Sequence, residues 1–246
     1  MKSLGVHRWG EGPPVVLVHG SVGGGESTWA EQRPLAERYT LIVVDRPGYG
    51  KTAMVEQEDF EDDASLVAGA LGEGAHLVGH SYGGVVSLLA AAVRPEAVRS
   101  LTVVEPPAFA LARGHPAVDA LVAALARHWS SADRDPDAFL RRFLELVGSS
   151  MRLPSPLPPE LERGARILLV ERPPWEAEIP LDILSGSAFP KLVVSGAHHV
   201  AFDAVCDVLE ERLSAERAVI GGAGHSVPRT GTPFNQRLEE FLRAAD

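Results

Sequence analysis

The segment Gly79-His80-Ser81-Tyr82-Gly83-Gly84 contains the residue types of a nucleophilic site. A serine hydroxyl can attack a carbonyl carbon, but at neutral pH it is a weak nucleophile unless a nearby base, usually histidine, removes its proton. That base in turn needs an acid that fixes its tautomer and stabilises its charged form. In the pattern Gly-x-Ser-x-Gly, the glycines allow a sharp turn that exposes the serine in strained geometry. We therefore take Ser81 as the candidate nucleophile.

The sequence around Ser81 has the context that such a turn requires. A short apolar run, Ala75 to Val78, predicts a strand before the turn, and a longer apolar run, Val85 to Val93, predicts a helix after it. In this context the motif resembles the nucleophile turn of the α/β-hydrolase superfamily, in its serine hydrolase branch. The resemblance implies an α/β-hydrolase fold, in which helices flank a mostly parallel central sheet. A plain strand-to-helix connection is the alternative interpretation.

The candidate base is His225. It lies in the glycine-rich segment 221–226, directly after the last predicted strand, Arg217 to Ile220. The superfamily places its catalytic histidine at this point of the chain, so the resemblance assigns the role of base to His225. A loop histidine without a role is the alternative. The superfamily's chain order of nucleophile, acid and base then allows any carboxylate between Ser81 and His225 to be the acid.

The acid departs from the commonest pattern of the superfamily, an aspartate in a Gly-x-x-Asp arrangement after the last strand but one. Here the segment Gly196-Ala197-His198-His199 puts a histidine in that place, which cannot act as the acid at neutral pH. The superfamily's known alternative is a carboxylate after the strand that follows the nucleophile helix, and Glu105 has this position. Asp203, in the predicted first turn of a helix, is the alternative acid. A site with no conventional acid is the third possibility.

A glycine-rich loop is the candidate oxyanion site. The apolar run Val15 to Val18 predicts a buried strand, and His19-Gly20-Ser21-Val22-Gly23 follows it. In the superfamily a His-Gly pair at this position opens the oxyanion loop. The resemblance implies a hole formed by the backbone N–H of Tyr82 and one from Ser21 or Val22. A flexible loop is the alternative.

The alternation of strands and helices divides the chain into two kinds of region. Over residues 1–107 and 190–246, short apolar runs alternate with helical patterns, which favours a right-handed βαβ sheet with its ligand crevice beyond the carboxyl ends of the strands. Over residues 108–189, apolar residues repeat only at helical spacing. We predict a core of residues 1–107 and 190–246 and a helical cap of residues 108–189 that gives an apolar pocket. An additional packing layer without a role in recognition is the alternative.

Two local segments carry structural predictions of their own. Thr28 and Glu31 have the spacing of a capping box, which predicts a helix from Trp29 to Arg38. We interpret the acidic run Glu56 to Asp63 as negative charge at the N-terminus of a helix from Ser65 to Leu71, where it interacts favourably with the positive end of the helix dipole.

Composition limits the partners that we expect. The formal net charge of −10 argues against nucleic acid and anionic membranes. The single cysteine, Cys206, excludes an internal disulfide and fits a reducing compartment, so we expect a cytoplasmic protein without a membrane span. His198, His199 and Asp203 match no standard ligand spacing, so we expect no metal and no cofactor. The expected partner is a small-molecule substrate, and the sequence does not indicate the oligomeric state.

These observations favour one function over several alternatives. We expect a serine hydrolase that cleaves a carboxylic ester of a small to medium apolar substrate, through a Ser81-His225-Glu105 triad and an acyl-enzyme intermediate. A serine at position 81 argues against the branches of the superfamily that use a carboxylate nucleophile. A thioesterase or acyltransferase, a lyase or cofactor-free oxygenase, and a ligand receptor on the same fold remain alternatives.

Overall fold

A seven-stranded sheet in the order β1-β3-β2-β4-β5-β6-β7 organises the fold. The computed structural model describes residues 2–131, 134–149, 151–222 and 224–246. The strands are β1 (Gly5–Trp9), β2 (Pro14–Val18), β3 (Thr40–Asp45), β4 (Ala75–His80), β5 (Val98–Val104), β6 (Lys191–Ser195) and β7 (Glu216–Val219). Only the pairing of β1 with β3, at one edge, is antiparallel. The prediction of a mostly parallel central sheet is confirmed.

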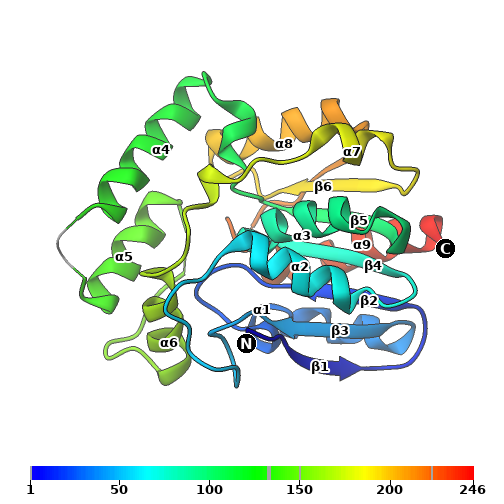
Figure 1. Ribbon diagram of the computed structural model, residues 1–246, viewed down its shortest axis with the longest axis horizontal. Helices are drawn as coiled ribbons and strands as arrows, with labels where there is room; N and C mark the ends of the chain where they lie inside the picture. The colour runs from blue at the N-terminus through cyan, green and yellow to red at the C-terminus, as the bar shows by residue number, and fades with distance from the viewer. Residues whose placement is uncertain (1, 132–133, 150, 223) are drawn as a thin grey trace.

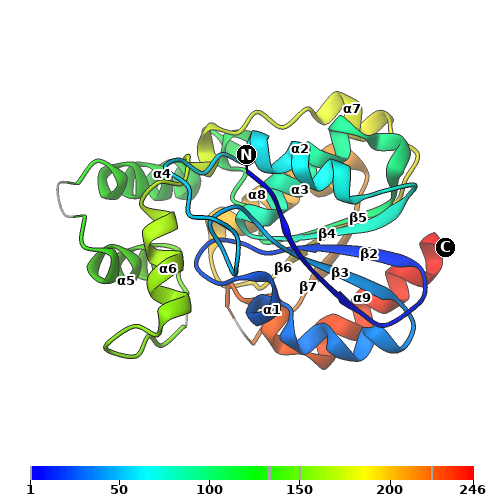
Figure 2. The ribbon, with the colours of Figure 1, turned by 60° about the horizontal axis from the view of Figure 1, so that its bottom comes forward.

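Helices cover both faces of the sheet (Figure 2). The helices are α1 (Gly25–Thr28), α2 (Phe60–Ala70), α3 (Tyr82–Val93), α4 (Pro116–Trp129), α5 (Pro136–Leu146), α6 (Pro159–Leu168), α7 (Leu181–Gly186), α8 (Val200–Leu213) and α9 (Thr232–Ala245). Short 3₁₀ turns connect them, of which Ala30–Glu37 is the longest. Among the described residues, no helix has the length and apolar character needed to cross a membrane.

The strands bury both of their faces, because side chains alternate along a strand. Val16 and Val18 of β2 belong to one core cluster, which also holds apolar residues of α2, α3 and α8. Val15 and Leu17 belong to a second cluster on the opposite face, which holds the apolar side of α9. These packed layers fix the carboxyl ends of the strands, where the candidate site lies.

The segment predicted as a helix, Trp29 to Arg38, forms a 3₁₀ helix over Ala30–Glu37 and not an α-helix. The α-helical turn begins earlier, at Gly25, and the chain continues as a 3₁₀ helix without a side-chain cap. Pro34 lies within this 3₁₀ helix and has no N–H to donate to an α-helical ladder. Gly25 lies so close to β3 that a Cβ there would come within 2.5 Å of the Val44 carbonyl oxygen. The start of the helix is therefore set by packing against the sheet, and the capping box at Thr28 does not form.

The acidic run Glu56 to Asp63, which extends into the first turn of α2, has two roles where one was predicted. The helix begins at Phe60, five residues before the predicted start at Ser65, because the Asp59 side chain accepts a hydrogen bond from the Glu61 N–H at 2.8 Å. Glu61 lies in the first turn, as the dipole argument predicts. Glu58 and Asp63, in contrast, are fully buried, which the interpretation as helix-end charge missed.

Three of the helices between β5 and β6 lie apart from the sheet. Helices α4, α5 and α6 lie to one side of the sheet, at the left of Figure 1. The apolar side chains of α5 and α6 form a third core cluster, which includes Val22 of the glycine-rich loop. Residues 132–133 and 150 of this region lie outside the described residues. The boundaries of the cap, residues 108–189, stay a prediction.

Candidate active site

Ser81 occupies a strained turn between β4 and α3. Its backbone has φ 54° and ψ −126°, outside the ordinary regions for a residue with a Cβ. Gly79 and Gly83 make the turn possible, since a Cβ on Gly79 would lie 2.3 Å from the Gly83 carbonyl oxygen and one on Gly83 would lie 2.4 Å from that of His19. Surrounding structure must hold such strain in place, and it is typical of functional sites.

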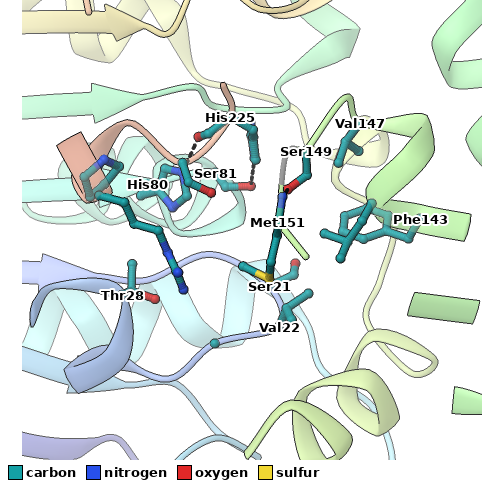
Figure 3. Close-up of a pocket in the computed structure, with 15 residues that line it drawn as sticks. Ser21, Val22, Thr28, His80, Ser81, Phe143, Val147, Ser149, Met151 and His225 are labelled. Carbon is teal, nitrogen blue, oxygen red and sulfur yellow. Dashed lines mark hydrogen bonds between the residues drawn. The ribbon is translucent and has the colours of Figure 1, made fainter. Parts of the chain in front are cut away.

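Three side chains from the ends of different strands meet at this turn. The Ser81 Oγ lies 2.8 Å from the His225 Nε2, and the His225 Nδ1 lies 3.2 Å from the Glu105 Oε2. Figure 3 shows the contact between Ser81 and His225 as a dashed line. Ser81 follows β4, Glu105 follows β5 and His225 follows β7. The structure therefore brings together the three residues that the sequence analysis selected as nucleophile, base and acid.

Glu105 is fully buried and has φ 52°. Its second carboxylate oxygen accepts a hydrogen bond from the Gly196 N–H. Burial alone would raise the pKa of Glu105, but the hydrogen bonds and charges of His198 and His225 outweigh it and lower this pKa to about 2. The carboxylate is therefore ionised at neutral pH, as an acid that supports a histidine base must be.

We expect this lowered pKa to appear in the acid stability of the protein. A carboxyl group whose pKa falls from 4.5 to about 2 on folding stabilises the folded state above the higher value, and this contribution is lost as the pH falls toward the lower one. Urea titrations should show that lowering the pH from about 6 to about 3 costs the wild type roughly 2 kcal/mol more unfolding free energy than it costs Glu105→Gln. Asp203→Asn is the control and should follow the wild type. Parallel pH curves for the wild type and Glu105→Gln would contradict the assignment.

His198 is a member of the site that the sequence analysis did not assign. Its Nδ1 lies 3.1 Å from the Glu105 Oε2, and its Nε2 lies 3.1 Å from the Val147 carbonyl oxygen at the end of α5. Burial lowers the pKa of His198, but the hydrogen bond and charge of Glu105, the Val147 carbonyl and the charge of Asp203 together outweigh it, so the net shift is upward. The sequence could have indicated His198 by its position just after β6, next to the place where the superfamily commonly has its catalytic aspartate.

Asp203, the alternative acid, lies in the first turns of α8. Its carboxylate is 3.7 Å from the Arg217 guanidinium, and the group that contacts His225 is Glu105. His199 caps α8, because its Nδ1 accepts a hydrogen bond from the Ala201 N–H at 3.1 Å. The structure therefore favours Glu105 over Asp203 as the acid.

Donor atoms at the site could in principle hold a metal ion. Glu105, His198 and His225 each offer one atom, and these atoms lie within 4.8 Å of one another. The carboxylate of Glu105, however, already accepts from Gly196 and contacts both imidazoles. Within the described residues, His198, His199 and Asp203, which the sequence analysis considered and set aside, are not among the groups whose possible ligand atoms lie within 4.8 Å of one another.

The backbone near Ser81 offers donors for an oxyanion. Tyr82 is the first residue of α3, so its N–H has no acceptor within the helix. Val22 has φ 81°, and its N–H donates a hydrogen bond of 3.4 Å to the Tyr49 hydroxyl. Because the Val22 N–H is engaged, the N–H of Ser21 is the better candidate for the second donor. The sequence analysis had given Ser21 and Val22 as the two candidates for this second donor.

His19 and His80 hold the loops of the site. The Arg46 N–H donates to the His19 Nε2 at 3.0 Å, and the His80 Nε2 lies 2.8 Å from the His225 carbonyl oxygen. Burial lowers the pKa of each of these two histidines to about 3. Both are therefore neutral at physiological pH, and they tie the glycine-rich loop and the His225 loop to the sheet.

A pocket with two parts surrounds Ser81. Five residues line both parts: Ser21, Ser81, Phe143, Val147 and His225. The inner part is mostly apolar, and its aromatic lining residues include Phe109, Trp129, Trp175 and Phe202. Figure 3 shows Phe143 and Val147 across the pocket from Ser81 and His225. Helices outside the sheet thus provide the wall that faces the nucleophile.

Comparison with known proteins places the chain in a family. A sequence profile of the alpha/beta hydrolase family matches residues 15–244. The chain belongs to this family. The superfamily inferred from the sequence is therefore confirmed.

Two relatives of this α/β hydrolase are each described as a pimeloyl-[acyl-carrier protein] methyl ester esterase. The one from Aeromonas hydrophila is 30% identical over 263 residues, covering 98% of this chain and 99% of the relative. The one from Methylococcus capsulatus is 38% identical over 176 residues, covering 70% of this chain and 66% of the relative. A solved alpha/beta hydrolase from Sphaerobacter thermophilus has the same fold, with a TM-score of 0.70, 24% identity, and coverage of 97% and 96% of the two chains.

Proposed function

We propose that this α/β hydrolase is a serine carboxylesterase in which Ser81 is the nucleophile, His225 the base and Glu105 the acid. The observation that carries the proposal is the unbroken contact from the Ser81 hydroxyl through the His225 ring to the Glu105 carboxylate, with distances of 2.8 and 3.2 Å. The two relatives described as methyl ester esterases support the same class of reaction.

The geometry gives each residue a step in ester hydrolysis. The Ser81 oxygen attacks the ester carbonyl carbon while the His225 Nε2 takes the hydroxyl proton. The Glu105 carboxylate holds the opposite side of the ring and stabilises the imidazolium that forms. The N–H groups of Tyr82 and Ser21 stabilise the oxyanion. His225 then protonates the leaving alcohol, and water, activated by the same histidine, releases the acid from the acyl-enzyme.

The pocket supports an apolar substrate of small to medium size. Its inner part offers aromatic walls, which favour an apolar acyl or alcohol group over a charged one. Helices α4 and α5 supply several of these walls, so we propose that residues 108–189 act as a cap that also keeps water from the site.

Phe143 should limit the length of the substrate, because its ring lines both parts of the pocket. We expect Phe143→Ala to shift the preference of the enzyme toward longer acyl chains. The ratio of kcat/KM for a longer p-nitrophenyl ester to that for a shorter one should rise about tenfold or more. Glu145→Ala, an exposed change on the same helix, is the matched control. An unchanged chain-length profile would show that the acyl group lies elsewhere.

A chain-length series of p-nitrophenyl esters, run beside thioesters of the same acids, tests the proposed reaction class. We expect the oxygen esters to be hydrolysed with the higher kcat/KM. Preference for thioesters, or transfer of the acyl group to an added alcohol in place of water, would assign the same three residues to a thioesterase or acyltransferase.

A further inference from the structure

Side chains of one buried group hold three consecutive residues of the oxyanion loop. We call Arg46, Tyr49, Glu58, Asp63 and Glu171 the buried charge cluster. The Arg46 Nη2 donates to the Gly20 carbonyl oxygen at 3.1 Å, the Ser21 hydroxyl donates to the Glu171 Oε2 at 2.6 Å, and the Val22 N–H donates to the Tyr49 hydroxyl at 3.4 Å. The conformation of the loop therefore depends on this cluster.

Glu171 is the member on which these contacts converge. Its Oε1 accepts from Arg46 at 2.7 Å and from the Tyr49 hydroxyl at 2.9 Å, while its Oε2 accepts from Ser21. Glu171 is only 4% exposed. Glu171 lines the inner part of the pocket, and both of its oxygens already accept hydrogen bonds from residues of the protein. Glu171 therefore acts on the site through its contacts with the oxyanion loop.

The remaining acids balance the charge of Arg46. Arg46 also donates to Glu58 and, at 3.2 Å, to Asp63, and all three of these side chains are fully buried. Burial raises the pKa of Glu58, and the adjacent Asp63 raises it further. Glu58 can therefore hold a proton, which limits the negative charge around the Arg46 guanidinium.

Glu171 also connects the loop to the helices that face the nucleophile. Glu171 lies just after α6, and its two neighbours in the chain pair with Glu58. The Glu58 N–H donates to the Val170 carbonyl oxygen at 3.0 Å, and the Arg172 N–H donates to the Glu58 carbonyl oxygen at 2.8 Å. Helix α6 packs against the loop so closely that a Cβ on Gly164 would lie 1.8 Å from the Val22 carbonyl oxygen. The oxyanion loop is thus fixed between the sheet and α6.

We propose that Glu171 is a positioning residue for the oxyanion hole, which it serves by holding the Ser21 hydroxyl and thereby orienting the Ser21 N–H. The proposal rests on the proposed function, since it assigns a role within the same site. A shift of about 1 Å in a stabilising donor is enough to slow a reaction by a large factor. Loss of this hydrogen bond should therefore weaken transition-state binding and leave ground-state binding unchanged.

The test removes the contact from each side. Ser21→Ala deletes the hydroxyl and leaves Arg46 with all its partners, so it remains informative even if Glu171→Gln disturbs folding. For both variants we expect kcat for an ester to fall about tenfold to hundredfold with little change in KM. A trifluoromethyl ketone analogue of that ester, which forms a tetrahedral oxyanion on Ser81, should lose affinity by the same factor. The carboxylic acid product should bind as it does to the wild type.

The double variant and a control variant give further tests of the proposal. The double variant Ser21→Ala/Glu171→Gln should be no less active than the less active of the two single variants, because both substitutions remove the same hydrogen bond. Glu162→Gln, an exposed carboxylate on α6 that pairs with Arg166, is the matched control and should keep full activity. Unchanged kcat in Ser21→Ala, or equal loss of affinity for the analogue and the product, would overturn the role of Glu171. Failure of the wild type to hydrolyse any ester would instead refute the proposed function.

Discussion

Replacing Ser81 with alanine is expected to lower kcat for ester hydrolysis by about 10⁵-fold to 10⁶-fold. The variant lacks the oxygen that attacks the ester, and the His225 Nε2, 2.8 Å from that oxygen in the structure, has no proton to remove. KM should change little, because the walls of the pocket are intact. Steady-state kinetics on a p-nitrophenyl ester would measure the loss, with circular dichroism to confirm the fold.

Ser65→Ala, an exposed serine on α2, is the matched control and should retain wild-type activity. The same experiment separates the remaining alternatives. A Ser81→Ala variant that keeps much of its activity would point to lyase or cofactor-free oxygenase chemistry, in which His225 acts mainly as a base. A wild type without activity on any ester, which nevertheless binds apolar ligands, would point to a receptor on this fold.

Replacing Glu105 with glutamine is expected to lower kcat by about 10³-fold to 10⁴-fold without unfolding the protein. The change keeps the shape of the side chain, and its carbonyl oxygen can still accept the Gly196 N–H. It removes the charge that stabilises the His225 imidazolium, and an amide nitrogen facing the His225 Nδ1 favours the wrong tautomer. Kinetics at several pH values would separate this effect from a change in protonation.

Asp203→Asn is the comparison that gives this result its meaning. Its carboxylate lies in α8 at 3.7 Å from Arg217, so the substitution should change kcat by less than about twofold. A large loss in Asp203→Asn combined with a small loss in Glu105→Gln would transfer the role of the acid to Asp203. Large losses in both would show that the two carboxylates act together.

Local sequence patterns predicted the parts of the fold on which the site depends. The apolar runs at Val15 to Val18 and at Ala75 to Val78 are too short for helices and lie in β2 and β4 of the parallel sheet. The carboxyl ends of β4, β5 and β7 lie at one edge of the sheet, and the selection of Ser81, Glu105 and His225 as one set came from the resemblance to the α/β-hydrolase superfamily. Their catalytic roles are the proposal made above.

Contacts between distant segments could not be predicted in this way. Arg46 and Glu171 are 125 residues apart, and no spacing rule links a turn after β3 to the chain that leaves α6. The same limit concealed the burial of Glu58 and Asp63, since an acidic run next to a helix is ordinarily exposed to solvent. The shortened helix at Gly25 was missed because packing against the sheet, and not local propensity, decides where it begins.

Labelling by a fluorophosphonate probe, followed by peptide mapping, tests the central claim most directly, because the probe reacts only with a serine that a nearby base activates. The account predicts one adduct per chain, on Ser81 alone, and little or none in a His225→Ala variant that remains folded. Ester hydrolysis by a protein whose Ser81 stays unlabelled, or an adduct on another residue that accounts for the loss of activity, would contradict it.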